Sequence, residues 1–214
     1  MIRLKTLCRA LCLATGLVAS AGMAQASALS TSGGTSTSLT GLPGTFNPNW
    51  FGDASLYAST FDLSAMLKGA SLILTQPAAV TYMFVGFEAS FNNALVSGAE
   101  RLNNRSGAYA NLGSSFSFSS VTAAPLDFSF LSNGSGPLFA NGNVNTGLVL
   151  SADRQSALIL FNDSFKGDGD FDDMVVRVSI SAVPEPEMLA MLLAGLGVIT
   201  AVVRRRRTQA SRQV

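Results

Sequence analysis

Short apolar runs separated by turn-forming residues occupy most of the chain between Trp50 and Ala182. From Met174 to Ser181 apolar side chains take every second position, and Phe116-Ser117-Phe118 and Phe128-Ser129-Phe130 repeat this alternation. A period of two predicts β-strands with one buried face. The runs predict strands at Ala54–Phe61, Ala70–Leu74, Val80–Phe87, Ser114–Val121, Leu126–Leu131, Leu148–Ser151, Ala157–Phe161 and Met174–Ser181.

This pattern predicts an all-β fold, an antiparallel β-sandwich or jelly-roll-like domain over residues 46–182, with Gly/Asn-rich connections such as Ser132–Gly147. Two segments, Asp62–Gly69 and Ala94–Leu102, have the composition of short helices. Residues 27–45 are rich in Ser, Thr and Gly, which predicts a flexible leader, with a ragged edge strand as the alternative.

The first 26 residues have the organisation of a secretory signal peptide. A basic start precedes an apolar run from Ala10 to Ala19, and Ala24-Gln25-Ala26 forms a small-x-small site. We therefore expect cleavage after Ala26, with Ala24 and Ala26 as the cleavage-site residues. A buried or membrane-spanning helix is the alternative, but the apolar run is short for a span.

The chain ends in three consecutive elements. A Pro-Glu-Pro element (183–187) precedes sixteen uncharged residues, Met188 to Val203, and an Arg cluster (204–207), before a tail at 208–214. Sixteen helical residues extend about 24 Å, against about 30 Å for a hydrocarbon core, so 188–203 predicts a minimal C-terminal transmembrane helix. The stop-transfer residues would be Arg204, Arg205, Arg206 and Arg207. A plain tail anchor is the simplest interpretation.

This C-terminal arrangement closely resembles the PEP-CTERM sorting signal of Gram-negative bacteria. The resemblance implies recognition by a membrane-embedded exosortase, a transient anchor in the inner membrane, cleavage, and release to the cell surface or an extracellular polysaccharide (biofilm) matrix. The recognition residues would be Val183, Pro184, Glu185 and Pro186.

Composition excludes several chemistries. The chain has no histidine, and its two cysteines, Cys8 and Cys12, both lie in the signal segment, so a mature chain would have neither disulfides nor Cys or His metal ligands. Residues 27–182 hold six basic and eleven acidic side chains, a net charge of −5. An acidic domain argues against nucleic-acid binding.

One loop carries candidate chemistry. Five carboxylates, Asp163, Asp168, Asp170, Asp172 and Asp173, occur within eleven residues, and Lys166 is the single cation among them. Crowded carboxylates repel one another unless a cation neutralises them, which predicts a Ca²⁺ site with Asp168, Asp170 and Asp172 as principal ligands. The alternative is an acidic turn whose side chains cap their own backbone. The loop is not an EF-hand, because strands flank it.

The stretch that runs from Leu158–Phe161 into Asp170–Val178, together with Tyr82–Asn93, resembles segments of an exported Asp-rich domain family of unknown function. The resemblance therefore implies no activity. We expect a non-enzymatic surface or matrix protein, with Ca²⁺ the only cofactor considered. A polysaccharide-binding adhesin is the alternative, with an aromatic platform at Trp50, Phe51 and Tyr57, and an ice-binding adhesin ranks below it. An enzyme would need a carboxylate pair such as Glu88 with Asp127, as in glycoside hydrolases, or a Ser-Lys arrangement at Lys68 or Lys166.

Overall fold

A computed structural model describes residues 28–39, 60–89, 91–105, 111–163, 169–183 and 186–210. In these residues it has eleven β-strands, one short 3₁₀ turn (Ser132–Gly134) and one α-helix. The strands are β1 Leu29–Ser38, β2 Ala65–Leu74, β3 Ala78–Gly86, β4 Ala94–Ser97, β5 Glu100–Asn103, β6 Ser115–Val121, β7 Ser129–Leu131, β8 Leu138–Ala140, β9 Thr146–Leu150, β10 Ser156–Phe161 and β11 Met174–Ala182, and the helix is α2 Pro186–Ala210.

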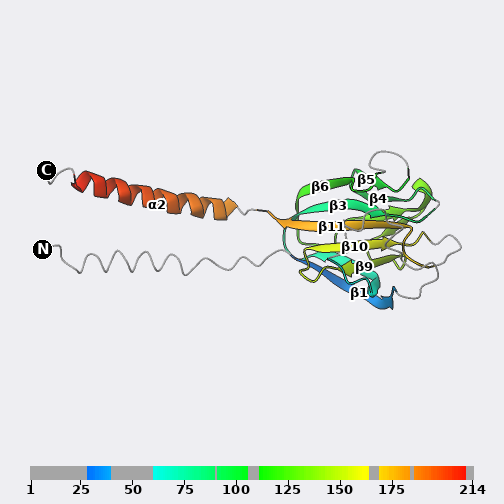
Figure 1. Cartoon of the computed structure of the whole chain (residues 1–214). Coiled ribbons are helices and arrows are strands. Elements are labelled where there is room, and N and C mark those ends of the chain that lie inside the picture. The colour runs from blue at the N-terminus through cyan, green and yellow to red at the C-terminus, as the bar shows by residue number, and fades with distance from the viewer. Residues whose placement is uncertain are drawn as a thin grey trace.

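The strands form two antiparallel sheets (Figure 1). The large sheet has the order β1-β2-β9-β10-β11-β3-β6, and the small sheet has the order β5-β4-β7-β8. All the strand pairs are antiparallel. The prediction of an all-β, antiparallel domain is therefore confirmed.

The main hydrophobic core joins the two sheets. Alternate residues of β11, from Met174 to Ile180, are buried in it together with Leu95 and Phe130 of the small sheet. The Phe130 ring stacks on Phe161 of β10, with ring centroids 4.5 Å apart. This distance is at the short end of the range in which aromatic pairs add stability beyond the area that they bury.

A second apolar cluster covers the opposite face of the large sheet. Leu158 and Leu160 of β10 point into it, along with Phe61 and Phe171. Every residue of β10 is buried, because its alternate side chains enter the two different clusters. This double burial explains why β10 appears in the sequence as a continuous apolar run rather than an alternating one.

The predicted leader contains a strand at the edge of the large sheet, so for residues 29–38 the expectation of a flexible segment is wrong and the alternative, an edge strand, is correct. β1 pairs with β2 along its whole length, from Leu29 opposite Leu74 to Ser38 opposite Ala65. Leu29 and Leu39 are buried at the two ends, while most of the Ser, Thr and Gly residues between them are exposed. Burial at both ends and backbone pairing make this polar edge strand regular, which its composition does not indicate.

Both helix predictions are also wrong. Asp62 accepts a hydrogen bond from the Ser64 N–H at 3.0 Å, but this contact turns the chain into β2 instead of starting a helix. Ala94–Leu102 forms the β4–β5 hairpin, in which Gly98 takes a φ of +57° in the two-residue turn with Ala99. That turn interrupts the apolar pattern that resembled a helical period.

The helix α2 occupies the predicted position of the transmembrane helix. It begins at Pro186, close after the end of β11, and its described apolar side chains are exposed. In the described part of the chain, no helix is long and apolar enough to cross a membrane. The helical conformation is therefore confirmed and the spanning role is not.

Candidate metal centre and sorting segment

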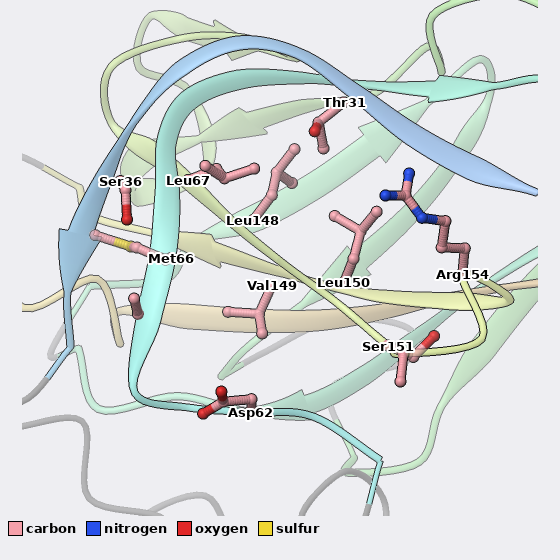
Figure 2. A pocket seen from close by; sticks show the side chains of 12 residues that line it. Thr31, Ser36, Asp62, Met66, Leu67, Leu148, Val149, Leu150, Ser151 and Arg154 are labelled. Carbon is pink, nitrogen blue, oxygen red and sulfur yellow. The ribbon is translucent and has the colours of Figure 1, made fainter.

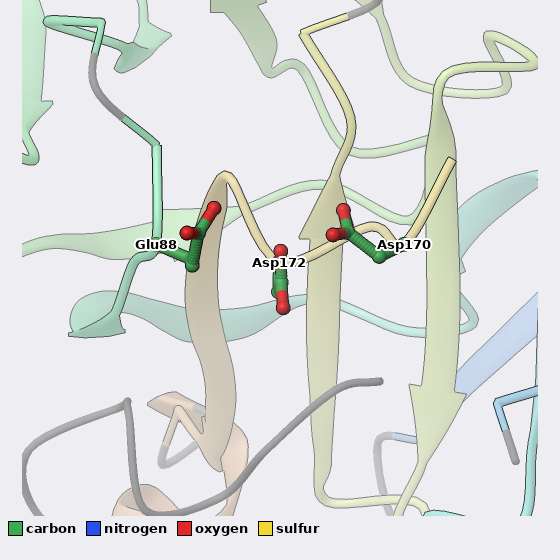
Figure 3. Close-up of side chains that lie close together, drawn as sticks. All are labelled: Glu88, Asp170 and Asp172. Carbon is green, nitrogen blue, oxygen red and sulfur yellow. The ribbon is translucent and has the colours of Figure 1, made fainter. Parts of the chain in front are cut away.

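Three carboxylates gather where β3 ends and β11 begins. Glu88 follows β3, and Asp170 and Asp172 precede β11, which pairs with β3. Their carboxylate oxygens, one from each residue, all lie within 4.8 Å of one another. Figure 3 shows Asp172 between the other two side chains. We call Glu88, Asp170 and Asp172 the carboxylate cluster.

Local backbone geometry creates this cluster. Phe171, between the two aspartates, has a φ of +64°, an uncommon value for a residue with a Cβ, and its ring is buried in the second apolar cluster. The Glu88 N–H donates to the Asp172 carbonyl oxygen at 2.9 Å, which holds the two segments together. The β3–β11 register also shifts between Val175 and Val176, and such bulges are common beside functional sites.

Asp170 and Asp172 are strongly buried, with 2% and 1% of their surfaces exposed, whereas Glu88 is exposed. The Oδ1 atom of Asp172 has no hydrogen-bond partner. Burial, which has the largest effect, a hydrogen bond to Asp170 and the negative charges of Asp170, Glu88 and Asp173 together raise the pKa of Asp172 to about 8. The folded protein thus holds Asp172 in an environment that opposes its ionised form.

A divalent cation matches this arrangement. Ca²⁺ binds carboxylate oxygens at about 2.4 Å, so one ion can contact two oxygens that are up to about 4.8 Å apart. The carboxylate oxygens of the cluster all lie within this separation, so a single Ca²⁺ ion can contact all three residues. A cation here would also be a partner for the Asp172 Oδ1 atom.

The structure describes four of the five predicted ligands and divides these four into two groups. Asp170 and Asp172 join the cluster, while Asp163 and Asp173 make structural contacts: the Asp163 N–H donates to Asp173 Oδ2 at 2.7 Å, and Asn93 Nδ2 donates to Asp163 Oδ2 at 3.1 Å. Within the described ranges the three-carboxylate cluster includes neither of them. Asp168 lies outside the described residues.

Glu88 is the member of the carboxylate cluster that the sequence analysis does not assign to a metal site. It was considered only as half of a catalytic pair with Asp127, which is exposed and precedes β7 in the small sheet. The feature of the sequence that could have identified Glu88 is its position just after the apolar strand β3. If β3 is known to pair with β11, which follows the Asp loop, antiparallel geometry places the end of β3 beside the start of β11.

Other sequence candidates are placed as follows. Lys68 lies with its Nζ 5.1 Å from the centre of the Phe171 ring, a cation–π contact, and Lys166 is outside the described residues. The proposed aromatic platform at Trp50, Phe51 and Tyr57 and the signal segment with Ala24 and Ala26 are likewise outside the described residues.

The large sheet also contains a hollow of about 430 Å³ (Figure 2). It forms because β2 and β9 pair only at Leu67 and Lys68 before diverging. Asp62 and Ser151 at its margin are engaged in local hydrogen bonds, Asp62 with the Ser64 N–H and Ser151 with Asp153 and the Ser156 carbonyl. We attribute this hollow to strand divergence.

The sorting segment follows β11 directly. Val183 comes next after the strand, Pro184 and Glu185 are outside the described residues, and Pro186 is the first residue of α2. The four predicted stop-transfer residues, Arg204, Arg205, Arg206 and Arg207, lie in the last two turns of α2.

Comparison with known families identifies this segment. Residues 182–207 match the PEP-CTERM protein-sorting motif. No curated protein and no solved structure is detectably similar to the chain. The motif implies export, sorting toward the cell surface through membrane transit, and processing by an exosortase.

Proposed function

We propose that the protein is a non-enzymatic component of the cell surface or extracellular matrix. The premise of this proposal is the PEP-CTERM protein-sorting motif of the chain. In this proposal an N-terminal signal peptide starts export, the exosortase recognises Pro184, Glu185 and Pro186, and the β-sandwich domain is the part that is delivered. The observation that carries the proposal is the match at residues 182–207, which begins at the last residue of β11.

The test is replacement of Pro184 and Glu185 by Ala in the native host. We expect the variant to be retained at its unprocessed mass, because the recognition element is lost. The control is Thr208→Ala with Gln209→Ala, which changes two residues of the same C-terminal region just beyond the matched motif. Normal maturation of both variants would refute the sorting role.

We further propose that the delivered domain is stabilised by Ca²⁺ at the carboxylate cluster. Three carboxylates from two chain segments, two of them buried, support this over a solvated acidic turn, whose carboxylates would point into water. Extracellular Ca²⁺ occupies sites with dissociation constants of about 10⁻⁴ to 10⁻³ M, so modest affinity is sufficient outside the cell.

Glu88→Gln distinguishes a Ca²⁺ site at the carboxylate cluster from a Ca²⁺ site formed by the Asp loop alone, because Glu88 lies far from the loop in sequence. At a hundredfold excess over its dissociation constant, Ca²⁺ stabilises a protein by about 2.7 kcal/mol. We expect this gain in the natural chain and its loss in Glu88→Gln, measured as the melting temperature with Ca²⁺ and with chelator. Glu100→Gln, at the start of β5, is the matched control, and an equal response in both variants would refute the cluster as the ligand set.

A further inference from the structure

A second hollow, of about 400 Å³, lies beside the connection between β7 and β8. Its walls include the half-buried rings of Phe91 and Phe139, and the Asp163 side chain also lines it. Asp163 is only 7% exposed, so a carboxylate is held against a largely apolar surface. The volume is in the range of small-molecule sites.

One buried side chain fixes two parts of this hollow. Asn93, which has no exposed surface, donates from Nδ2 to Asp163 Oδ2 at 3.1 Å and accepts at Oδ1 from the Asn133 N–H at 3.2 Å. Asn133 has a φ of +50°, in the left-handed region. Asp163 is held from its other side, because its N–H donates to Asp173 Oδ2. The positions of Asn133 and Asp163 are thus set before any ligand arrives.

The lining combines two aromatic residues with several residues that carry hydrogen-bonding side chains. Ser132, Asn133 and Ser135 contribute two hydroxyls and an amide beside the Asp163 carboxylate. A sugar ring needs this combination, because its C–H face packs on an aromatic ring while its hydroxyls donate to carboxylate and amide oxygens.

We propose that this hollow binds a neutral hexose unit of an extracellular polysaccharide. The inference deepens the proposed function and rests on it, since export would bring the domain to such a polymer. Acidic sugars are disfavoured by the Asp163 carboxylate and by the net charge of −5 over residues 27–182. A small organic cation would use the carboxylate and a ring but leave the two hydroxyls and the amide without a role.

The test uses the full chain in detergent micelles, because α2 exposes apolar side chains. The probes are methyl β-D-glucopyranoside, methyl β-D-galactopyranoside and methyl α-D-mannopyranoside, measured by saturation-transfer NMR and calorimetry. We expect saturable binding of at least one. Phe91→Leu removes ring stacking and should weaken binding about tenfold. Asp163→Asn removes the charge but keeps an oxygen for Asn93, and should weaken binding to a similar degree.

Leu138→Ala is the matched control, because Leu138 is 62% exposed on β8 and does not line the hollow. Ser135→Trp, at an exposed position, fills the hollow and should abolish binding even if Phe91→Leu or Asp163→Asn fails to fold.

The proposal is overturned if none of the three glycosides binds, if binding survives Ser135→Trp, or if tetramethylammonium binds in their place. Its failure is distinct from failure of the sorting role. Loss of sugar binding leaves maturation in the native host unchanged, and altered maturation leaves sugar binding by the purified chain unchanged.

Discussion

The most informative perturbation of the carboxylate cluster is Asp172→Asn, which removes a charge while keeping the shape of the side chain. Burial, then the hydrogen bond to Asp170, then neighbouring carboxylates raise the pKa of Asp172 from an ordinary value near 4 to about 8. Between these values the folded protein binds a proton that the unfolded chain has released. Stability contributed by this proton is complete below about pH 4 and is lost as the pH rises toward 8.

The magnitude follows from this window. Each pH unit within it lowers the free energy of unfolding by up to about 1.4 kcal/mol, which gives an upper limit of about 4 kcal/mol between pH 4 and pH 7. Part of this loss of stability comes from repulsion by the exposed Glu88 carboxylate, which water screens. We therefore expect the free energy of unfolding to fall by about 2 kcal/mol between pH 4 and pH 7. Without calcium, Asp172→Asn should therefore be more stable than the natural chain at pH 7, by about 4 to 8 °C in melting temperature.

Calcium should reverse this order, because the natural chain gains a bound ion and the variant lacks one ligand. The assay is thermal unfolding followed by circular dichroism from pH 5 to 8, with chelator and with calcium. Asp153→Asn is the control: hydrogen bonds from Ser151 and the Gln155 N–H lower the pKa of Asp153, so its removal should not stabilise the protein. If Asp172→Asn melts below the natural chain in chelator, the account of a penalised buried carboxylate is wrong.

Two further predictions concern the sheets. Asn141→Ala should lower the free energy of unfolding by about 2 to 3 kcal/mol in denaturant titrations, because the Asn141 side chain makes three hydrogen bonds of 2.8 Å, to the N–H and carbonyl of Leu72 and the carbonyl of Leu126. An effect no larger than that of Thr37→Ala, whose hydroxyl makes one exposed contact, would contradict this role. Gly34→Ala should be destabilising by more than about 1 kcal/mol, since Gly34 has a φ of +82° and a Cβ there would lie 2.8 Å from the Ala70 nitrogen. Gly33→Ala shares the positive φ but meets open space, so equal losses in the two variants would show that the close approach to Ala70 is irrelevant.

How far the fold could be predicted depended on where the apolar residues lie. β10 and β11 were predicted to within one residue at each end, because their buried side chains give clear apolar patterns. β8 was missed, since a three-residue strand between Pro137 and Asn141 is too short to show a period. β1 appears in the sequence only as the alternative to a flexible leader, because its stability comes from pairing with β2 and from the buried Leu29 and Leu39, which no local window detects.

The members of the candidate metal centre could be predicted from the sequence only in part, for the same reason. The Asp loop is visible as a local cluster of charge, so Asp170 and Asp172 could be named. The cluster's third member, Glu88, depends on strand pairing across more than eighty residues. Likewise, Asp163 accepts a hydrogen bond from Asn93, which is distant in sequence and is brought close only by the fold. The spacing of the aspartates along the chain therefore cannot distinguish a metal ligand from a carboxylate with a structural contact.

The position of β11 has a mechanical consequence. The sorting segment begins at the last residue of this strand, and β11 lies inside the large sheet between β10 and β3, with six backbone partners on one side and eight on the other (Figure 1). A pull on the C-terminal end therefore acts along β11 and loads both rows of hydrogen bonds in shear, so that they share the force instead of opening one after another. A domain tethered in this way resists extraction from its own sheet, and drag on the domain would reach the processing site with the fold intact.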